Sequence, residues 1–148
     1  MSKIGRPRVL LVCYAGAHIG LGHLSRLLAL AQALKKDSRV QIEFLVFGES
    51  VSKAGLNNFK THFIPASTDF LTGVTRFVTK EMTCVVFDLY AVEKNINLKT
   101  LFVELKTQNI SLINVDCLTQ FDDLIDLIWI PSFYFKTYQS LTYQDKIK

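Results

Sequence analysis

The sequence has 148 residues and a formal net charge of +4, with 49% hydrophobic and 20% charged residues. This length fits a single domain, and the composition excludes a disordered or low-complexity chain. The basic excess lies in the two terminal segments, at residues 3–8 and 136–148, so the body between them is nearly neutral. We therefore expect no nucleic-acid partner.

The amino-terminal segment argues against membrane insertion and secretion. Its longest apolar run, Val9 to Ala17, is shorter than the roughly 20 residues that span a bilayer, and it leads into a glycine-rich turn rather than a cleavage site. We expect no transmembrane segment and a cytoplasmic location. Cys13, Cys84 and Cys117 lack metal-site spacing, so they are predicted to be reduced core residues, and we expect no metal. We also expect no cofactor.

Buried strands alternate with helices along the sequence. The apolar patterns predict strands over residues 8–15, 40–47, 62–64, 84–87, 111–115 and 127–130, and helices over 23–36, 50–59, 69–82 and 92–108, with a turn at 121–126. This alternation predicts a Rossmann-like three-layer α/β/α sandwich with a mostly parallel sheet of about six strands. Residues 1–131 then form one domain, and residues 132–148 form an aromatic tail or connector.

A glycine-rich loop follows the first predicted strand. Gly20 and Gly22 directly precede the first helix, where the free amides and the positive helix end favour a phosphate or a carboxylate. The alternative is that these glycines serve the turn alone.

Polar side chains near this loop are candidates for chemistry. His23 lies in the first helical turn, where the helix dipole favours the neutral ring that a general base needs. Arg26 shares its face and can pair with an anion. Asp88 and Asp116 follow two strands and can orient the histidine, and His18 lies in the loop. Structural roles as caps, salt bridges or solvated residues remain open for all of them.

Other phosphate motifs fit less well. The sequence contains no Gly-Lys-Ser or Gly-Lys-Thr, which excludes a P-loop. A dinucleotide fingerprint requires a small residue three positions after Gly22, where Ser25 stands, and Glu49 after the second strand is a candidate for binding ribose.

The segment Ile19 to Arg26 resembles the first motif of the GT-B superfamily, Gly-x-Gly-His-x-x-Arg, and is most similar to the UDP-sugar hydrolase of pseudaminic acid biosynthesis and related glycosyltransferases. Segments 86–90 and 112–116 resemble two later strands of that family. The resemblance implies hydrolysis or transfer of a UDP-linked sugar in cell-surface glycan synthesis, with His23 as the base that activates water. It implies a substrate site formed by Gly20, Leu21, Gly22, Arg26, His18, Asp88, Tyr90 and Asp116.

Two departures from the family shape the expectation. Leu89 replaces the histidine that follows the family's aspartate, and the sequence has no second, nucleotide-binding GT-B domain. We therefore expect a truncated or split enzyme that works with a second domain or subunit, or as a homodimer. The alternatives are a non-catalytic partner subunit of a split glycosyltransferase and a dinucleotide-binding domain.

Overall fold

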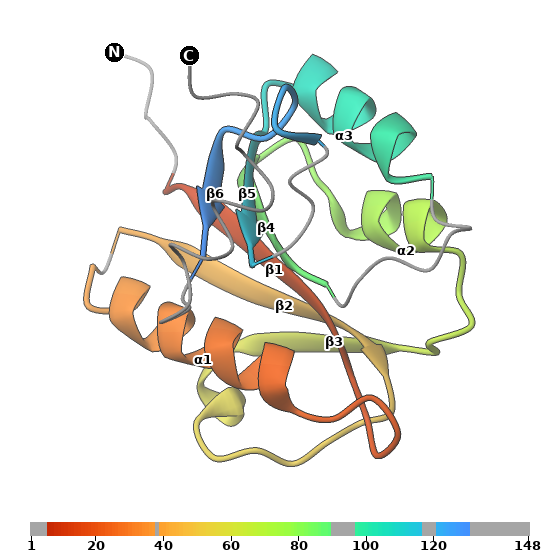
Figure 1. Ribbon diagram of the computed structural model, residues 1–148. Helices are drawn as coiled ribbons and strands as arrows, with labels where there is room; N and C mark the ends of the chain where they lie inside the picture. Colours follow the sequence, from red (N-terminus) through yellow and green to blue (C-terminus); the bar gives the residue numbers. More distant parts are fainter. Residues whose placement is uncertain (1–5, 38, 90–96, 117–120, 131–148) are drawn as a thin grey trace.

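The computed structural model describes residues 6–37, 39–89, 97–116 and 121–130, and it arranges them as a central sheet between helices (Figure 1). The elements in chain order are β1 (Arg8–Ala15), α1 (Gly22–Leu34), β2 (Gln41–Gly48), the 3₁₀ helix η1 (Leu56–Asn58), β3 (Lys60–Ile64), α2 (Phe70–Phe77), β4 (Met82–Asp88), α3 (Leu98–Thr107), β5 (Ser111–Val115) and β6 (Leu127–Trp129).

The six strands form one sheet in the order β3-β2-β1-β4-β5-β6, and every neighbouring pair is parallel. The predicted Rossmann-like fold is thereby confirmed. Chain order reverses between β1 and its neighbour β4, and ligands of open parallel sheets bind at the carboxyl ends of the strands beside such a point. We call that side of the sheet the carboxyl edge.

The strands are buried because both faces of the sheet are covered. Helix α1 packs on one face against alternate residues of β1 and β2, while α2 and α3 cover the other (Figure 1). Successive residues of β1 point to opposite faces, so Leu10 and Val12 join α2 and α3, and Leu11 and Cys13 join α1. This double burial explains why β1 is apolar almost throughout.

Two predicted helices differ from the structure. The helix expected over residues 50–59 is only the short η1, preceded by Gly55 at φ +88°. The helix expected over 69–82 ends at Phe77, and Met82 already belongs to β4. The helix expected over 92–108 is described from Leu98 to Thr107, and the predicted tail, 132–148, lies outside the described residues.

Cys13 and Cys84 are both free thiols, and Cys13 is fully buried. Burial raises the pKa of both, that of Cys84 to about 11, so both remain protonated at neutral pH. Cys117 lies outside the described residues. In the described part of the chain, no helix is both long enough and apolar enough to cross a membrane.

Candidate functional site

The loop between β1 and α1 forms a tight turn at the carboxyl edge. The amide of Gly20 donates to the carbonyl oxygen of Gly16 at 2.8 Å, and Gly20 has φ +89°, which favours glycine. Helix α1 begins at Gly22, and its N-cap residue, Leu21, makes no side-chain hydrogen bond to the helix. The backbone amides in the first turn of α1 therefore receive no hydrogen bond from the side chain of Leu21, and amides in this position can bind an anion.

A cavity of about 600 Å³, here called the first hollow, lies at the carboxyl ends of β1, β2 and β3. It is lined by residues 15–19 at the end of β1 and in the glycine loop, by residues 48–49 at the end of β2, and by residues 63–67 at the end of β3 and directly after it. Its volume is within the range of small-molecule sites. Three consecutive connections of the parallel sheet thus share one cavity.

Glu49 places a carboxylate at this cavity, and the backbone conformation of Gly48 directs the chain into Glu49. Gly48 has φ +145°, and a Cβ there would lie 1.8 Å from the carbonyl oxygen of Ala15, so the chain requires glycine at this position. Glu49 follows directly, is exposed and lines the first hollow.

A second group of polar residues joins α1 to the ends of β4 and β5. It consists of His23, Arg26, Asp88 and Asp116, and we call it the Asp88 cluster. Arg26 donates to Asp88 from Nε at 2.9 Å and from Nη2 at 2.7 Å, and Nη1 donates to Asp116 at 3.1 Å. Asp88 is fully buried, and its hydrogen bond raises the pKa of Arg26. Two donors from one guanidinium therefore neutralise a buried carboxylate.

His23 completes the cluster through its Nδ1 atom, 2.7 Å from Oδ1 of Asp88. Because a carboxylate only accepts, Nδ1 must carry the proton. The 3.1 Å approach of Arg26 Nη2 to the same nitrogen then brings two donors together and is a contact rather than a hydrogen bond. In the neutral ring, Nε2 becomes the acceptor.

The structure places the predicted site residues in two groups. His23, Arg26, Asp88 and Asp116 meet in the Asp88 cluster, although Arg26 and Asp116 are 90 positions apart. His18 instead lines the first hollow. Gly20 and Leu21 are exposed in the loop, and Gly22 is exposed at the start of α1. Tyr90 lies outside the described residues.

Sequence reasoning missed several features of this edge. Residues 63–67 contribute to the first hollow because β3 is parallel to β2. In the sequence, the only local indication was Pro65, which follows a short apolar run and indicates the end of a strand. Asn114 is fully buried in β5, and both its side-chain polar atoms lack a hydrogen-bond partner among the described residues. Asp116 adopts φ 74°, which is uncommon for a residue other than glycine.

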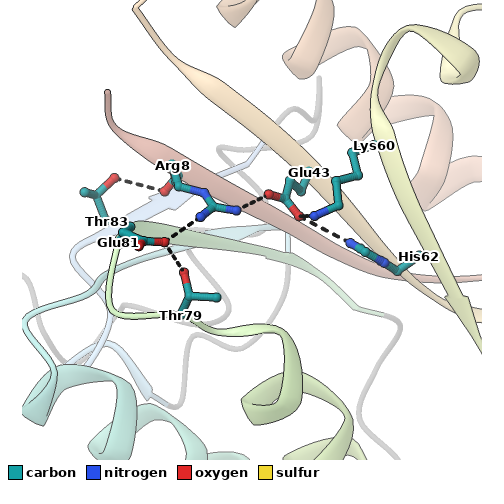
Figure 2. A network of polar contacts seen from close by, with 7 residues as sticks. All are labelled: Arg8, Glu43, Lys60, His62, Thr79, Glu81 and Thr83. Atoms are coloured by element: carbon teal, nitrogen blue, oxygen red, sulfur yellow. Dashed lines mark hydrogen bonds and ion pairs between the residues drawn. The ribbon is translucent and has the colours of Figure 1, made fainter. Parts of the chain in front are cut away.

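The amino ends of the strands carry a separate ion-pair network (Figure 2). Glu43 accepts from Arg8, from Lys60 at 3.0 Å and from His62 at 3.2 Å, and Arg8 also donates to Glu81 at 2.7 Å. Because these charges pair with one another across β1, β2 and β3, the network connects strands. Within the described residues, no group of three or more His, Cys, Asp or Glu side chains has the geometry to hold a metal ion.

Comparison with known proteins finds similarity in structure alone. No family model and no curated protein matches the sequence. A crystal structure of S. aureus homoserine dehydrogenase at pH 7.0 matches with a TM-score of 0.48 and 11% identity, over 85% of this chain and 33% of that one. The structures at pH 6.0 and 7.5 give TM-scores of 0.46 and 0.47 at the same identity, over 84% of this chain and 33% and 32% of theirs. The chain spans about a third of the length of these structures.

These matches contradict the GT-B prediction. The similar structures are dehydrogenases rather than glycosyltransferases or sugar hydrolases, so the GT-B family, the UDP-sugar substrate and the second GT-B domain were wrong. The physical reason lies in the motif. Gly20 is favoured by a left-handed turn, and Gly22 begins a helix. A parallel sheet with this strand–loop–helix unit favours glycine at such positions whatever ligand it binds, so the glycines do not identify the GT-B family.

Proposed function

We propose that the chain is a dinucleotide-binding domain that holds the ribose of the dinucleotide in the first hollow and its phosphates at the start of α1, which follows the glycine loop. The observation that carries this proposal is the first hollow itself, which joins the glycine loop, Glu49 and the end of β3 at the carboxyl edge. The strand order β3-β2-β1-β4-β5-β6 supports it, because the glycine loop that lines the first hollow follows β1, the strand beside which this order reverses, and dinucleotides bind at such a point.

The phosphates fit the start of α1. Its first amides point out of the helix toward the loop, and the helix dipole adds positive potential there. Space for a ligand is present, since a Cβ built on Gly20 or Gly22 would meet no atom within 4 Å. A diphosphate therefore has both donors and room beside this loop.

The ribose fits Glu49. A carboxylate after the second strand accepts hydrogen bonds from both ribose hydroxyls, and it repels a phosphate attached to the 2′ position. Glu49 occupies that place and lines the cavity. The proposal therefore specifies NAD rather than NADP as the ligand.

Binding of NAD⁺ and NADP⁺ to the purified chain, measured by isothermal titration calorimetry, tests the proposal. NAD⁺ should bind more tightly than NADP⁺. Glu49→Gln should weaken NAD⁺ binding by roughly tenfold, because it removes a charged hydrogen-bond acceptor. It should also narrow the difference between the affinities for NAD⁺ and NADP⁺.

The control is Glu81→Gln, which removes an exposed glutamate near the amino ends of the strands. It should leave NAD⁺ binding unchanged. Absence of NAD⁺ binding by the unmodified chain, or equal affinities of the Glu49→Gln and unmodified chains, would contradict the proposal.

A further inference from the structure

The face of the sheet that carries α1 is only partly covered in the described part of the chain. The apolar cluster beneath α1 and η1 contains residues of β1 and β2, and it extends to Val86 of β4 and Val115 of β5. No described residue of β6 belongs to that cluster. The cover that α1 and η1 give to this face therefore ends at β5.

Two large apolar side chains of β6 lie on this same face. The parallel register pairs Leu127 with Ile113 and Trp129 with Val115, and both residues of β5 pack in the α1 cluster. Paired residues of neighbouring strands point to the same side of a sheet. Leu127 is 54% exposed and Trp129 is 43% exposed. We call these two side chains, together with the half-buried Ile113, the open face.

The opposite face of β6 is covered. Ile128 packs against the cluster of α2 and α3, and so do Phe121, Leu124 and the buried Ile125, which precede β6. Sheets in which all strands are parallel occur almost only where both faces are covered. The open face therefore requires a cover that the described residues do not supply.

The predicted aromatic tail, residues 132–148, has side chains that suit this face, although the tail itself lies outside the described residues. Its aromatic residues are Phe133, Tyr134, Phe135, Tyr138 and Tyr143. One aromatic side chain buries about 150–250 Å² of surface, so two or three of them suffice to cover a leucine and a tryptophan.

Attachment favours the tail over a second copy of the chain as the occupant. The tail begins three positions after Trp129, and a directly attached segment meets a neighbouring surface at an effective concentration on the order of millimolar. A second copy would have to give up translational and rotational freedom to reach the same face. Two exposed side chains also fall well short of the roughly 800 Å² per partner that a stable interface buries.

We propose that the aromatic tail packs on the open face and covers Leu127 and Trp129. The tail is then a part of the domain that completes the α1 side of the sheet, rather than a connector. The inference does not depend on dinucleotide binding, so the two proposals stand or fall separately.

Trypsin cleavage after Lys136 of the tail tests the proposal, because a packed segment is cut only when it opens. Leu127→Asp places a charge on the open face and should speed this cleavage by about tenfold, as followed by mass spectrometry. Val103→Asp is the matched control, since Val103 is 45% exposed on α3, which covers the opposite face. It should be cleaved after Lys136 at the rate of the unmodified chain.

Equal cleavage rates of the Leu127→Asp and Val103→Asp chains would overturn the proposal. A rate that falls as the protein concentration rises would also overturn it, because the protection would then come from a second copy.

A second measurement changes the tail alone, so it leaves the sequence of every described element intact. Replacement of the five aromatic residues of the tail with serine should raise the hydroxyl-radical labelling of Trp129 at least about twofold, because the aromatic cover is removed. Unchanged labelling of Trp129 would show that the tail does not cover the open face.

Discussion

Glu43 makes the largest number of ion pairs in the amino-end network (Figure 2). Burial, the largest single influence, acts to raise its pKa, but hydrogen bonds from Arg8, Lys60 and His62 together lower that pKa from 4.5 to about 2. Because the folded state binds the proton less readily than the unfolded chain, this carboxylate stabilises the fold above about pH 4.5. The stabilisation is lost as the pH falls toward 2.

Glu43→Gln should therefore lower the free energy of unfolding by about 2 kcal/mol at pH 7, with the difference shrinking between pH 4.5 and pH 2. Urea denaturation followed by circular dichroism across this range measures it. Glu81→Gln is the control, because Glu81 contacts the same Arg8 from a side chain that is 72% exposed. Glu81→Gln should lower the free energy of unfolding by less than about 1 kcal/mol. Parallel pH profiles for unmodified and Glu43→Gln chains would contradict the prediction.

At the scale of elements, the strands were predictable and the β2–β3 connection was not. Strands buried on both faces show as continuous apolar runs, and β1 begins and ends where that run predicts. Residues 50–59 carry a mixed pattern of small and polar side chains, and packing of Leu56 and Phe59 against the core determines their path instead. The sequence has no local signal for such contacts.

The junction of β1 and β2 depends on a single glycine. Gly48→Ala should reduce the free energy of unfolding by at least about 3 kcal/mol, because the added Cβ would overlap the carbonyl oxygen of Ala15. Thermal and urea denaturation measure this loss. Gly22→Ala is the matched control: its added Cβ would meet no atom within 4 Å, so its stability should change by less than about 0.5 kcal/mol. Equal stabilities of the two variants would show that Gly48 is not constrained.

At the scale of the whole molecule, the Asp88 cluster joins the two halves of the sheet. Arg26 belongs to α1, which follows β1, whereas Asp88 ends β4 and Asp116 directly follows β5. The residue types of this cluster were visible in the sequence, and a parallel sheet brings strand ends to one edge. The pairing of Arg26 with two carboxylates required the strand order, which no local pattern contains.

Arg26→Met should lower the free energy of unfolding by about 3 kcal/mol, because it leaves the buried Asp88 without its cationic partner. In the double variant with Asp88→Asn, the loss should be smaller than the sum of the two single losses. Urea denaturation of the four proteins of this double-mutant cycle measures the coupling. Additive losses would mean that Arg26 and Asp88 do not stabilise the fold as a pair.

The functional prediction failed for a reason that also acts at this scale. Gly20 serves a left-handed turn, and Arg26 pairs with Asp88 and Asp116 within the fold, so the order of these residues along the chain does not by itself identify a function. The first hollow depends on three connections that meet in space, and residues 63–67 carried no recognisable motif.

The edge strand β6 gives the molecule an optical reporter. Trp129 is the one tryptophan of the sequence, and this residue is 43% exposed at the end of β6. The backbone carbonyl oxygen of Trp129 accepts from the amide of Asp116 at 2.8 Å, and Arg26 donates to the side chain of that same Asp116. Intrinsic fluorescence excited at the indole therefore reports from a single known position next to the Asp88 cluster, with no added label.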